Sequence, residues 1–392
     1  MPAHPSRANH CFAFFILYSV FWLLTPFNQL PNMKAIHQFV AGFTAGDAIS
    51  NEALTLRALF RRWGHAAEIF CEPSRTGPAL RKEARDTAQA SEVVGPDDIV
   101  LLHLSIGSAA NDLFAGLACR KALRYHNITP AHFFRGLQEE LARDLAWGRD
   151  QARTLAKTAA VNMADSQFNA RELIALGYPA VHVMPLVLDF DAIGARADRR
   201  ILRALEDGRI NILFVGRCAP NKRIEDALCA FSYFQKTVEP NSRFIHVGSF
   251  AGLERYQALL NVYARNLHLD QAVFAGAVPQ GELSAYYEGA HLFLCMSEHE
   301  GFCIPLIESM AHNLPILAYA AGAVPETLDG AGVLVREKQW GPIAEMMGQL
   351  TSRGMFREAV VRGQQQRLKR YQERDLEAEL KACLAPLLRN AE

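Results

Sequence analysis

The sequence lacks the features that mark several classes of protein. Its 392 residues carry 41 basic and 41 acidic side chains, and this balance argues against a nucleic-acid binder, which needs a broad basic surface. The eight cysteines form no CxxC pair and no Cys/His spacing typical of zinc ligands. We therefore expect neither a disulfide framework nor a zinc site, and a reducing compartment is favoured. Because the chain also has no GxGxxG fingerprint, a dinucleotide cofactor is not indicated.

The first 32 residues form a hydrophobic leader that fits three interpretations. Residues 11–27 are apolar and uncharged, with Arg7 before them and Lys34 after them. This run is slightly short for a transmembrane anchor, and no small-x-small cleavage site of a signal peptide follows it. We prefer a mis-called upstream start, with Met33 as the first residue, because a strand pattern begins directly after Met33. A cytoplasmic location is then expected, since the rest of the chain needs no export.

From Met33 onward, strand-like and helix-like segments alternate. Strands are predicted at 35–40, 67–71, 98–104, 121–125, 158–164 and 181–188, and then at 211–215, 243–247, 272–275, 292–296, 315–320 and 332–335. This alternation is typical of α/β proteins with doubly wound parallel sheets, and the length of the chain predicts two domains. We expect Rossmann-like domains at 33–190 and 191–370, with a linker near 187–208 and a C-terminal segment at 371–392.

Small and polar residues follow several strands of the first half, at the edge where open α/β sheets bind ligands. The loop after the first predicted strand contains Gly46 and Asp47, and Asp47 can cap the helix that follows. Two later strands end close to His103 and His126. A single histidine is more often a packed residue than a catalytic one, but two at equivalent strand ends make this edge a candidate site.

Two loops of the second half carry charges that suit a phosphorylated sugar ligand. One contains Arg217 and Lys222 between a strand and a helix, and two cations at such a junction suit a diphosphate. The other contains Glu300, and Glu308 lies about one turn inside the helix that follows. The start of that helix offers free N–H groups to an anion, and carboxylates accept hydrogen bonds from sugar hydroxyls. The alternative is that these charges are merely solvated.

The stretch from Ser297 to Glu308 resembles the signature of the retaining GT-B glycosyltransferases of family 4, also called glycosyl transferases group 1. That signature contains the string S-x-x-E-G-F, and a second Glu follows its Glu after seven residues. In this chain the two glutamates are Glu300 and Glu308. The G-R-x-x-x-x-K pattern from Gly216 and the S-x-F-N-x-x-E-L pattern from Ser166 resemble the same family. The resemblance therefore covers nearly the whole chain after the leader.

The resemblance implies a role for each candidate in a cleft between the two domains. Glu300 would hold hydroxyls of the transferred sugar, and Glu308 would hold the ribose. Arg217 and Lys222 would stabilise the departing diphosphate, and His126 would reach the transferred sugar.

The remaining implied residues belong to the same site. His103 is the second histidine candidate. The donor-binding set comprises Gly46, Asp47, Gly216, Gly248, Gly301, Phe302, Cys303, Ile304 and Glu308. The chain departs from the family at Arg223 and at Cys303, two positions where relatives often have glycine.

The implied activity is the transfer of a hexose, with mannose among the candidates, from a GDP- or UDP-sugar to a saccharide or lipid-linked acceptor in cell-surface polysaccharide biosynthesis. The family implies retention of configuration, no metal and no other cofactor. It also implies that the first domain binds the acceptor, the second binds the nucleotide sugar, and the last helix packs on the first domain. The alternatives are a nucleotide-sugar 2-epimerase of the same fold and a non-catalytic sugar-nucleotide-binding protein.

A peripheral contact with the inner face of the membrane is a further interpretation. Basic and aromatic residues on one predicted helix, and a short aromatic loop, could touch a membrane surface; they are Arg57, Arg61, Arg62, Trp63, Phe133, Phe134 and Arg135. An ordinary helix face is the preferred alternative.

Overall fold

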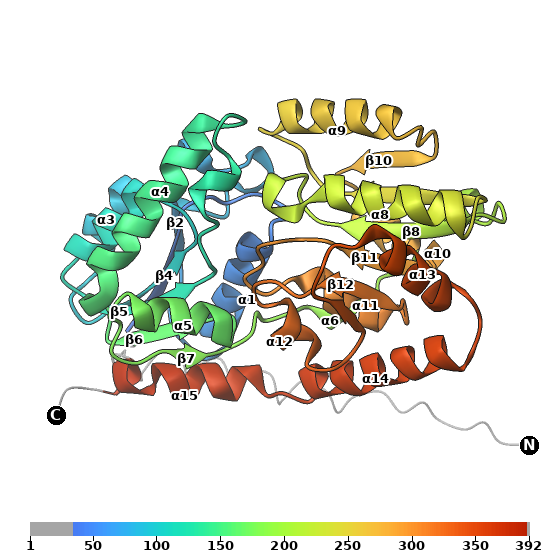
Figure 1. The fold of residues 1–392 in the computed structure, drawn as a ribbon. Helices are drawn as coiled ribbons and strands as arrows, with labels where there is room; N and C mark the ends of the chain where they lie inside the picture. The colour runs from blue at the N-terminus through green and yellow to red at the C-terminus, as the bar shows by residue number, and fades with distance from the viewer. Residues whose placement is uncertain (1–33, 390–392) are drawn as a thin grey trace, which may run out of the picture.

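The computed structural model describes residues 34–389, so the leader predicted at 1–32 lies outside the described residues. Within that range the strands form one sheet of seven and one of six. Every strand pair in both sheets is parallel. Figure 1 shows the two sheets in separate lobes, each covered by helices. The predicted fold class, two doubly wound α/β domains, is confirmed.

The first sheet has the strand order β3-β2-β1-β4-β5-β6-β7. Its strands are β1 (Ile36–Val40), β2 (Ile69–Cys71), β3 (Arg85–Asp86), β4 (Ile99–Leu104), β5 (Arg120–Tyr125), β6 (Val161–Ala164) and β7 (His182–Val183). The order reverses between β1 and β4, and in open parallel sheets such a reversal creates a crevice at the carboxyl ends of the two strands.

The second sheet repeats this arrangement in the order β10-β9-β8-β11-β12-β13. Its strands are β8 (Ile210–Val215), β9 (Ser242–Val247), β10 (Ala272–Gly276), β11 (Leu292–Cys295), β12 (Ile316–Tyr319) and β13 (Val333–Val335). The reversal here lies between β8 and β11, so the loops that follow these two strands flank the second crevice.

The helices connect the strands and cover the sheets. Those of the first half are α1 (Ala48–Arg62), α2 (Ala90–Val93), α3 (Ala109–Gly116), α4 (Glu139–Thr154) and α5 (Gln167–Ala175). Those that follow are α6 (Phe190–Ile193), α7 (Arg199–Leu205), α8 (Ile224–Thr237), α9 (Glu254–Asn266), α10 (Gln280–Gly289), α11 (Ile304–Ala311), α12 (Val324–Leu328), α13 (Trp340–Thr351), α14 (Met355–Gln372) and α15 (Leu376–Leu388). None of the helices between residues 34 and 389 combines the length and the hydropathy needed to cross a bilayer.

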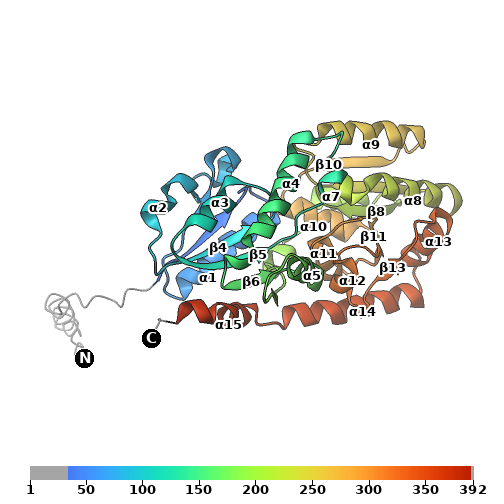
Figure 2. The same cartoon turned by 60° about the vertical axis from the view of Figure 1, so that its left-hand side comes forward.

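The last two helices run beneath both lobes. Figures 1 and 2 show α14 along the second lobe and α15 along the first. Leu380 and Leu384 of α15, one helical turn apart, are fully buried in a cluster with Ile99 and Val161 of the first sheet. The chain therefore returns from the second domain to the first and closes its core from below.

The strand boundaries agree with the predicted ones to within three residues, with one exception. The segment predicted as a strand over 181–188 pairs only at 182–183, and this prediction is wrong for the remainder. Pro185 has no N–H to donate to a ladder, and Val187 N donates instead to the carboxylate of Glu52, 3.0 Å away. The two-residue strand β3 was not predicted.

The basic face suggested for membrane contact is occupied within the protein. Arg62 Nη2 and Trp63 Nε1 donate to the Glu377 carboxylate of α15, at 3.1 and 2.7 Å. Phe133 packs against the Arg223 guanidinium, and Phe134 is buried. These contacts favour the ordinary helix face over a membrane surface.

Candidate functional site

A salt bridge joins the two charged loops of the second crevice. Lys222 lies in the loop after β8 and Glu300 in the loop after β11, and Lys222 Nζ donates to Glu300 Oε2 at 2.6 Å. Glu300 is only 6% exposed, whereas the lysine side chain is 22% exposed. Desolvation alone would lower the pKa of Lys222, but the negative charge and the hydrogen bond of Glu300 outweigh it and raise that pKa. The ammonium group therefore stays charged at the edge of the crevice.

Unusual backbone geometry shapes both loops. Arg223 and Cys303, the two departures from the glycine common in the family, have φ values of +48° and +72°. In this left-handed region only glycine is free of strain. At Gly248 a β-carbon would lie 1.9 Å from the Gly216 carbonyl oxygen, so the ends of β8 and β9 approach each other too closely for any side chain.

The second glutamate of the motif lies behind the first, on α11. Tyr287 of α10 donates its hydroxyl to Glu308 Oε2 at 2.6 Å, and the Tyr287 ring stacks on His312 at 5.2 Å. Burial raises the pKa of Glu308, and the hydrogen bond from Tyr287 opposes this shift. The carboxylate is thus held in one position by an aromatic partner that the sequence did not identify as part of the site.

Arg217 lies in the loop after β8, and its Nη2 donates to the Ala251 carbonyl at 3.3 Å. Burial lowers the pKa of Arg217, while the negative charge of Asp47 acts to raise it. Asp47 itself caps α1, because its carboxylate accepts from Ser50 N at 2.9 Å, as the sequence predicts. Gly46, immediately before it, has φ +82°. Asp47 of the first domain is therefore close enough to Arg217 of the second for its charge to act on the guanidinium.

Gly301, next to Glu300, is the point where the two domains meet. A β-carbon on this glycine would lie 2.9 Å from the His126 carbonyl oxygen and 2.8 Å from Cβ of Asn127. Ser166 of the first domain donates its hydroxyl to the Gly301 carbonyl at 2.7 Å. Only glycine fits here, so the motif loop rests directly on the segment that follows β5.

Further contacts across the domains surround this point. His299 Nε2 donates to Asn127 Oδ1 at 2.5 Å. The carboxylate of Glu326 accepts from the backbone N–H groups of Gln167 and Phe168, at 2.6 and 3.1 Å, where α5 begins. Desolvation lowers the pKa of His299 to about 4, so it is neutral at this interface.

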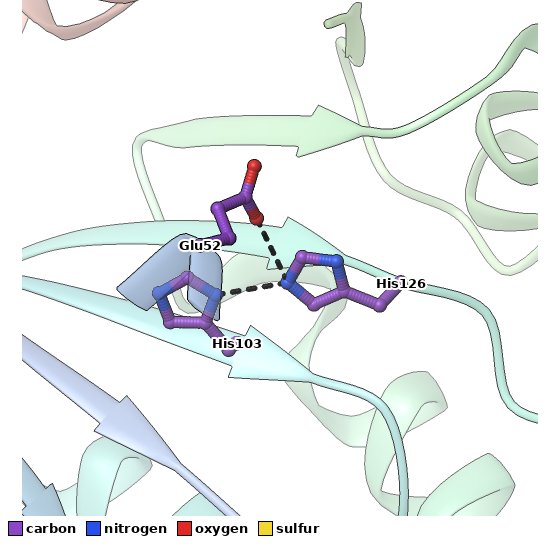
Figure 3. Close-up of side chains that lie close together, drawn as sticks. All are labelled: Glu52, His103 and His126. Atoms are coloured by element: carbon purple, nitrogen blue, oxygen red, sulfur yellow. Dashed lines mark hydrogen bonds and ion pairs between the residues drawn. The ribbon is translucent and has the colours of Figure 1, made fainter. Parts of the chain in front are cut away.

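His126 lies beside this contact, but its imidazole points into the first domain. Its Nδ1 bonds Asp165 Oδ2 at 2.8 Å. Its Nε2 lies 2.8 Å from His103 Nδ1 and 3.7 Å from Glu52 Oε2 (Figure 3). The side chain is 2% exposed. The His126 backbone carbonyl, rather than the ring, therefore faces the motif loop.

Two groups within residues 34–389 place three potential ligand atoms within 4.8 Å of one another. The first is Glu52, His103 and His126, where the two imidazoles already bond each other and Arg124 is paired with Glu52 at 2.8 Å. The second is Cys295, Glu300 and Cys303, where Lys222 already holds the carboxylate. In each set the carboxylate already pairs with a neighbouring cation, which makes either set a poor fit for a metal ion.

The remaining predicted residues line the same loop. Phe302 is buried and its carbonyl accepts from Thr327. Ile304 is the first residue of α11, and Cys303 precedes it. The sequence analysis did not predict Asn127, His299 and Glu326 as interface residues. Asn127 has a positive φ, which asparagine tolerates better than most residues, so its residue type is the one signal that the sequence offers.

The comparisons with known proteins agree with this geometry. Residues 197–375 match the family described as glycosyl transferases group 1. Over 179 residues the chain is 31% identical to a GDP-mannose-dependent alpha-mannosyltransferase of Mycobacterium tuberculosis, which covers 45% of this chain and 42% of that protein. Over 177 residues it is 26% identical to O-antigen chain mannosyltransferase B of Escherichia coli, covering 43% and 45%. The chain thus matches less than half the length of these relatives.

Solved structures resemble nearly the whole described chain. Anabaena HepE in complex with UDP and glucose has a TM-score of 0.69 at 15% identity and covers 90% of this chain and 100% of its own. Sucrose-phosphate synthase from Thermosynechococcus elongatus has a TM-score of 0.70 at 15% identity, covering 90% and 99%. At such identities the likeness concerns the fold. The chain therefore has the GT-B fold, and its residues 197–375 form a domain of the glycosyl transferases group 1 family.

Proposed function

We propose that the protein is a family 4 glycosyltransferase that moves a hexose from a GDP- or UDP-sugar to a saccharide or lipid-linked saccharide acceptor. Mannose is the first donor sugar to test, because two of the relatives are named as mannosyltransferases. The GDP-mannose named for one of them makes GDP the first base to test. The role in cell-surface polysaccharide biosynthesis, the cytoplasmic location and the acceptor remain predictions.

The observation that carries this proposal is the salt bridge between Lys222 and Glu300 at the crevice of the second sheet. A departing nucleoside diphosphate needs preorganised positive charge where its own charge develops. Lys222 and Arg217 supply it from the loop after β8. The carboxylate of Glu300 then keeps one oxygen for sugar hydroxyls.

The pairing also favours one mechanism over another. A carboxylate held by an ammonium group at 2.6 Å is a weakened nucleophile, which argues against a covalent intermediate on Glu300. In the front-face alternative, the bond from the anomeric carbon to the diphosphate breaks, the acceptor oxygen bonds the same face, and its proton passes to the leaving phosphate. This reaction retains the anomeric configuration and needs neither a metal ion nor a protein base.

Calorimetry with GDP, UDP, GDP-mannose and UDP-glucose tests donor binding, and a transfer assay with and without a chelator tests the reaction. We expect one of the two nucleotides to bind, and we expect transfer to continue in the presence of the chelator. The Lys222→Ala variant should lose both nucleotide binding and transfer. Lys369→Ala, which removes an exposed lysine of α14, is the matched control. Binding of neither nucleotide, or full transfer by Lys222→Ala, would contradict the proposal.

Product analysis separates the remaining alternatives. A 2-epimerase converts the donor sugar without any acceptor, and a non-catalytic binding protein leaves the donor intact. A transferase needs the acceptor for its glycosidic product, whose anomeric configuration NMR can compare with that of the donor.

A further inference from the structure

A buried polar cluster lies in the first domain, directly behind the contact with the motif loop. Its members come from four elements: Glu52 from α1, His103 from β4, Arg124 from β5, and Asp165 from the residue after β6, all around His126. Figure 3 shows Glu52 and His103 both directed at one ring nitrogen of His126. The five side chains are between 0% and 2% exposed.

Each histidine has a second partner besides the other ring, and these two partners show where two of the ring protons lie. Gln38 Nε2 donates to the Ala53 carbonyl at 2.9 Å, which orients the amide and leaves Gln38 Oε1 as an acceptor. His103 Nε2 lies 2.9 Å from this oxygen and must donate to it. At the other end, His126 Nδ1 lies 2.8 Å from the Asp165 carboxylate and donates to it.

The bond between the histidines requires a third proton. His103 Nδ1 and His126 Nε2 are 2.8 Å apart, and two bare nitrogen lone pairs would repel each other at this distance. One of the nitrogens must therefore carry a proton. Two imidazoles with three ring protons have one positive charge. Burial and the neighbouring positive charges put the pKa of His103 well below its usual value; the geometry assigns the charge to the pair as a whole.

The surrounding charges favour this cation. Arg124 is paired with Glu52 at 2.8 Å and with Asp165 at 3.3 Å, which leaves one negative charge of the two carboxylates uncompensated. Glu52 Oε2 has no hydrogen-bond partner and lies 3.7 Å from His126 Nε2. With Glu52 ionised, a charged histidine pair makes the cluster neutral. A neutral pair would bury a net negative charge at high cost, unless a proton moved to Glu52, whose pKa burial raises.

Among residues 34–389, the groups that contact these side chains from the other elements named here are uncharged. α15 contributes Cys383 near Arg124, and burial raises the pKa of this thiol, so it is uncharged at neutral pH. β1 contributes the amide of Gln38, and the segment after β7 contributes the carbonyls of Met184 and Pro185, which accept from Arg124 at 3.2 and 2.9 Å.

We propose that His103 and His126 act as one buried cation that positions the segment after β5 against the motif loop. The carbonyl of His126 and the side chain of Asn127 meet Gly301, so loss of the shared proton would separate the rings and loosen this contact. Glu52, His103 and Asp165 are then positioning residues for the sugar-transfer site. This functional role rests on the proposed transferase activity, whereas the charge of the pair does not.

Nitrogen NMR of the full chain with labelled histidine tests the charge directly. We expect three protonated ring nitrogens and one unprotonated nitrogen in this pair at pH 7. A coupling across the N–H···N hydrogen bond identifies the pair without any substitution. Two protonated nitrogens, or no coupling, would overturn the proposal whether or not the protein proves to be a transferase.

The pH dependence of transfer tests the positioning role. Glu52→Gln removes one negative charge beside the pair, so the shared proton should leave at lower pH. We expect the alkaline limb of the activity profile to move down by at least one pH unit, that is, by a tenfold change in proton affinity. Glu92→Gln, on an exposed position of α2, should leave the profile unchanged. If the Glu52→Gln variant folds and its alkaline limb stays where it is in the wild type, the positioning role is wrong. If the variant does not fold, the wild type supplies the test: the role is wrong if activity falls at a pH different from the one at which the NMR coupling is lost.

Discussion

Replacing Lys222 by methionine should destabilise the ligand-free protein by about 3 kcal/mol. Methionine keeps the packing of the lysine stem but removes the ammonium group 2.6 Å from Glu300. Glu300 is 6% exposed, and a carboxylate left buried without its partner typically costs about 3–5 kcal/mol. The lower end applies here because the lysine side chain is 22% exposed, so water can reach part of the site.

The reverse substitution should cost less. Glu300→Gln leaves Lys222 unpaired, but this longer side chain can turn toward water, so we expect a loss of about 1 kcal/mol. In the double variant no unpaired charge is buried, and its stability should come within about 1 kcal/mol of the wild type. The double-mutant cycle should therefore give a coupling energy of about 3 kcal/mol.

Urea unfolding of the four ligand-free proteins measures this cycle, and calorimetry measures nucleotide binding in parallel. The double variant should recover stability but not binding, since a lost charge contact with a diphosphate typically weakens the affinity by about 10–150-fold. A Lys222→Met variant within about 0.5 kcal/mol of the wild type would refute the argument from burial. Recovery of binding in the double variant would refute the assignment of Lys222 to the diphosphate.

Three further predictions concern the same domain. Burial raises the pKa of Glu308, so its ionised form is penalised in the folded state as the pH rises through that pKa. Glu308→Gln should therefore stabilise the ligand-free protein at pH 7 by about 1 kcal/mol and abolish nucleotide binding. At Cys303, with φ +72°, Gly should be more stable than Ala by about 1 kcal/mol, reversing the usual order. Burial lowers the pKa of His246 to about 4 from 6.5, so stability should fall as the pH drops below 6.5, by about 2 kcal/mol at pH 5, and His246→Gln should remove this loss.

Denaturation curves at several pH values check all three. The advantage of Glu308→Gln should vanish near pH 4, and an advantage that persists there would point to packing instead. An alanine at position 303 that matches or exceeds glycine would show that the backbone strain is relieved elsewhere. If His246→Gln retains the full acid loss between pH 6.5 and 5, another group is responsible for it.

The alternation of strands and helices could be predicted from the sequence, because buried parallel strands are continuous apolar runs. Such a run is visible locally and does not depend on distant residues. The same holds for the cap of α1 by Asp47 and for the pair Glu300 and Glu308, whose spacing is local. The exception, the segment after β7, shows the limit. There Val187 N is taken by Glu52, a partner 135 residues away, and no local pattern reveals such a partner.

Sequence motifs placed Arg217, Lys222, Glu300 and Glu308 in one candidate site, because three of them lie in loops that follow strands of a parallel sheet and Glu308 lies in the helix after one of these loops. Only the tertiary structure showed what each residue faces. The ring of His126 points into a buried cluster, its carbonyl lies against Gly301, and Lys222 pairs with Glu300. These outcomes depend on charges and close contacts between segments far apart in the chain. Local sequence determines the elements and their order, whereas burial and distance in the folded molecule decide which charges are paired.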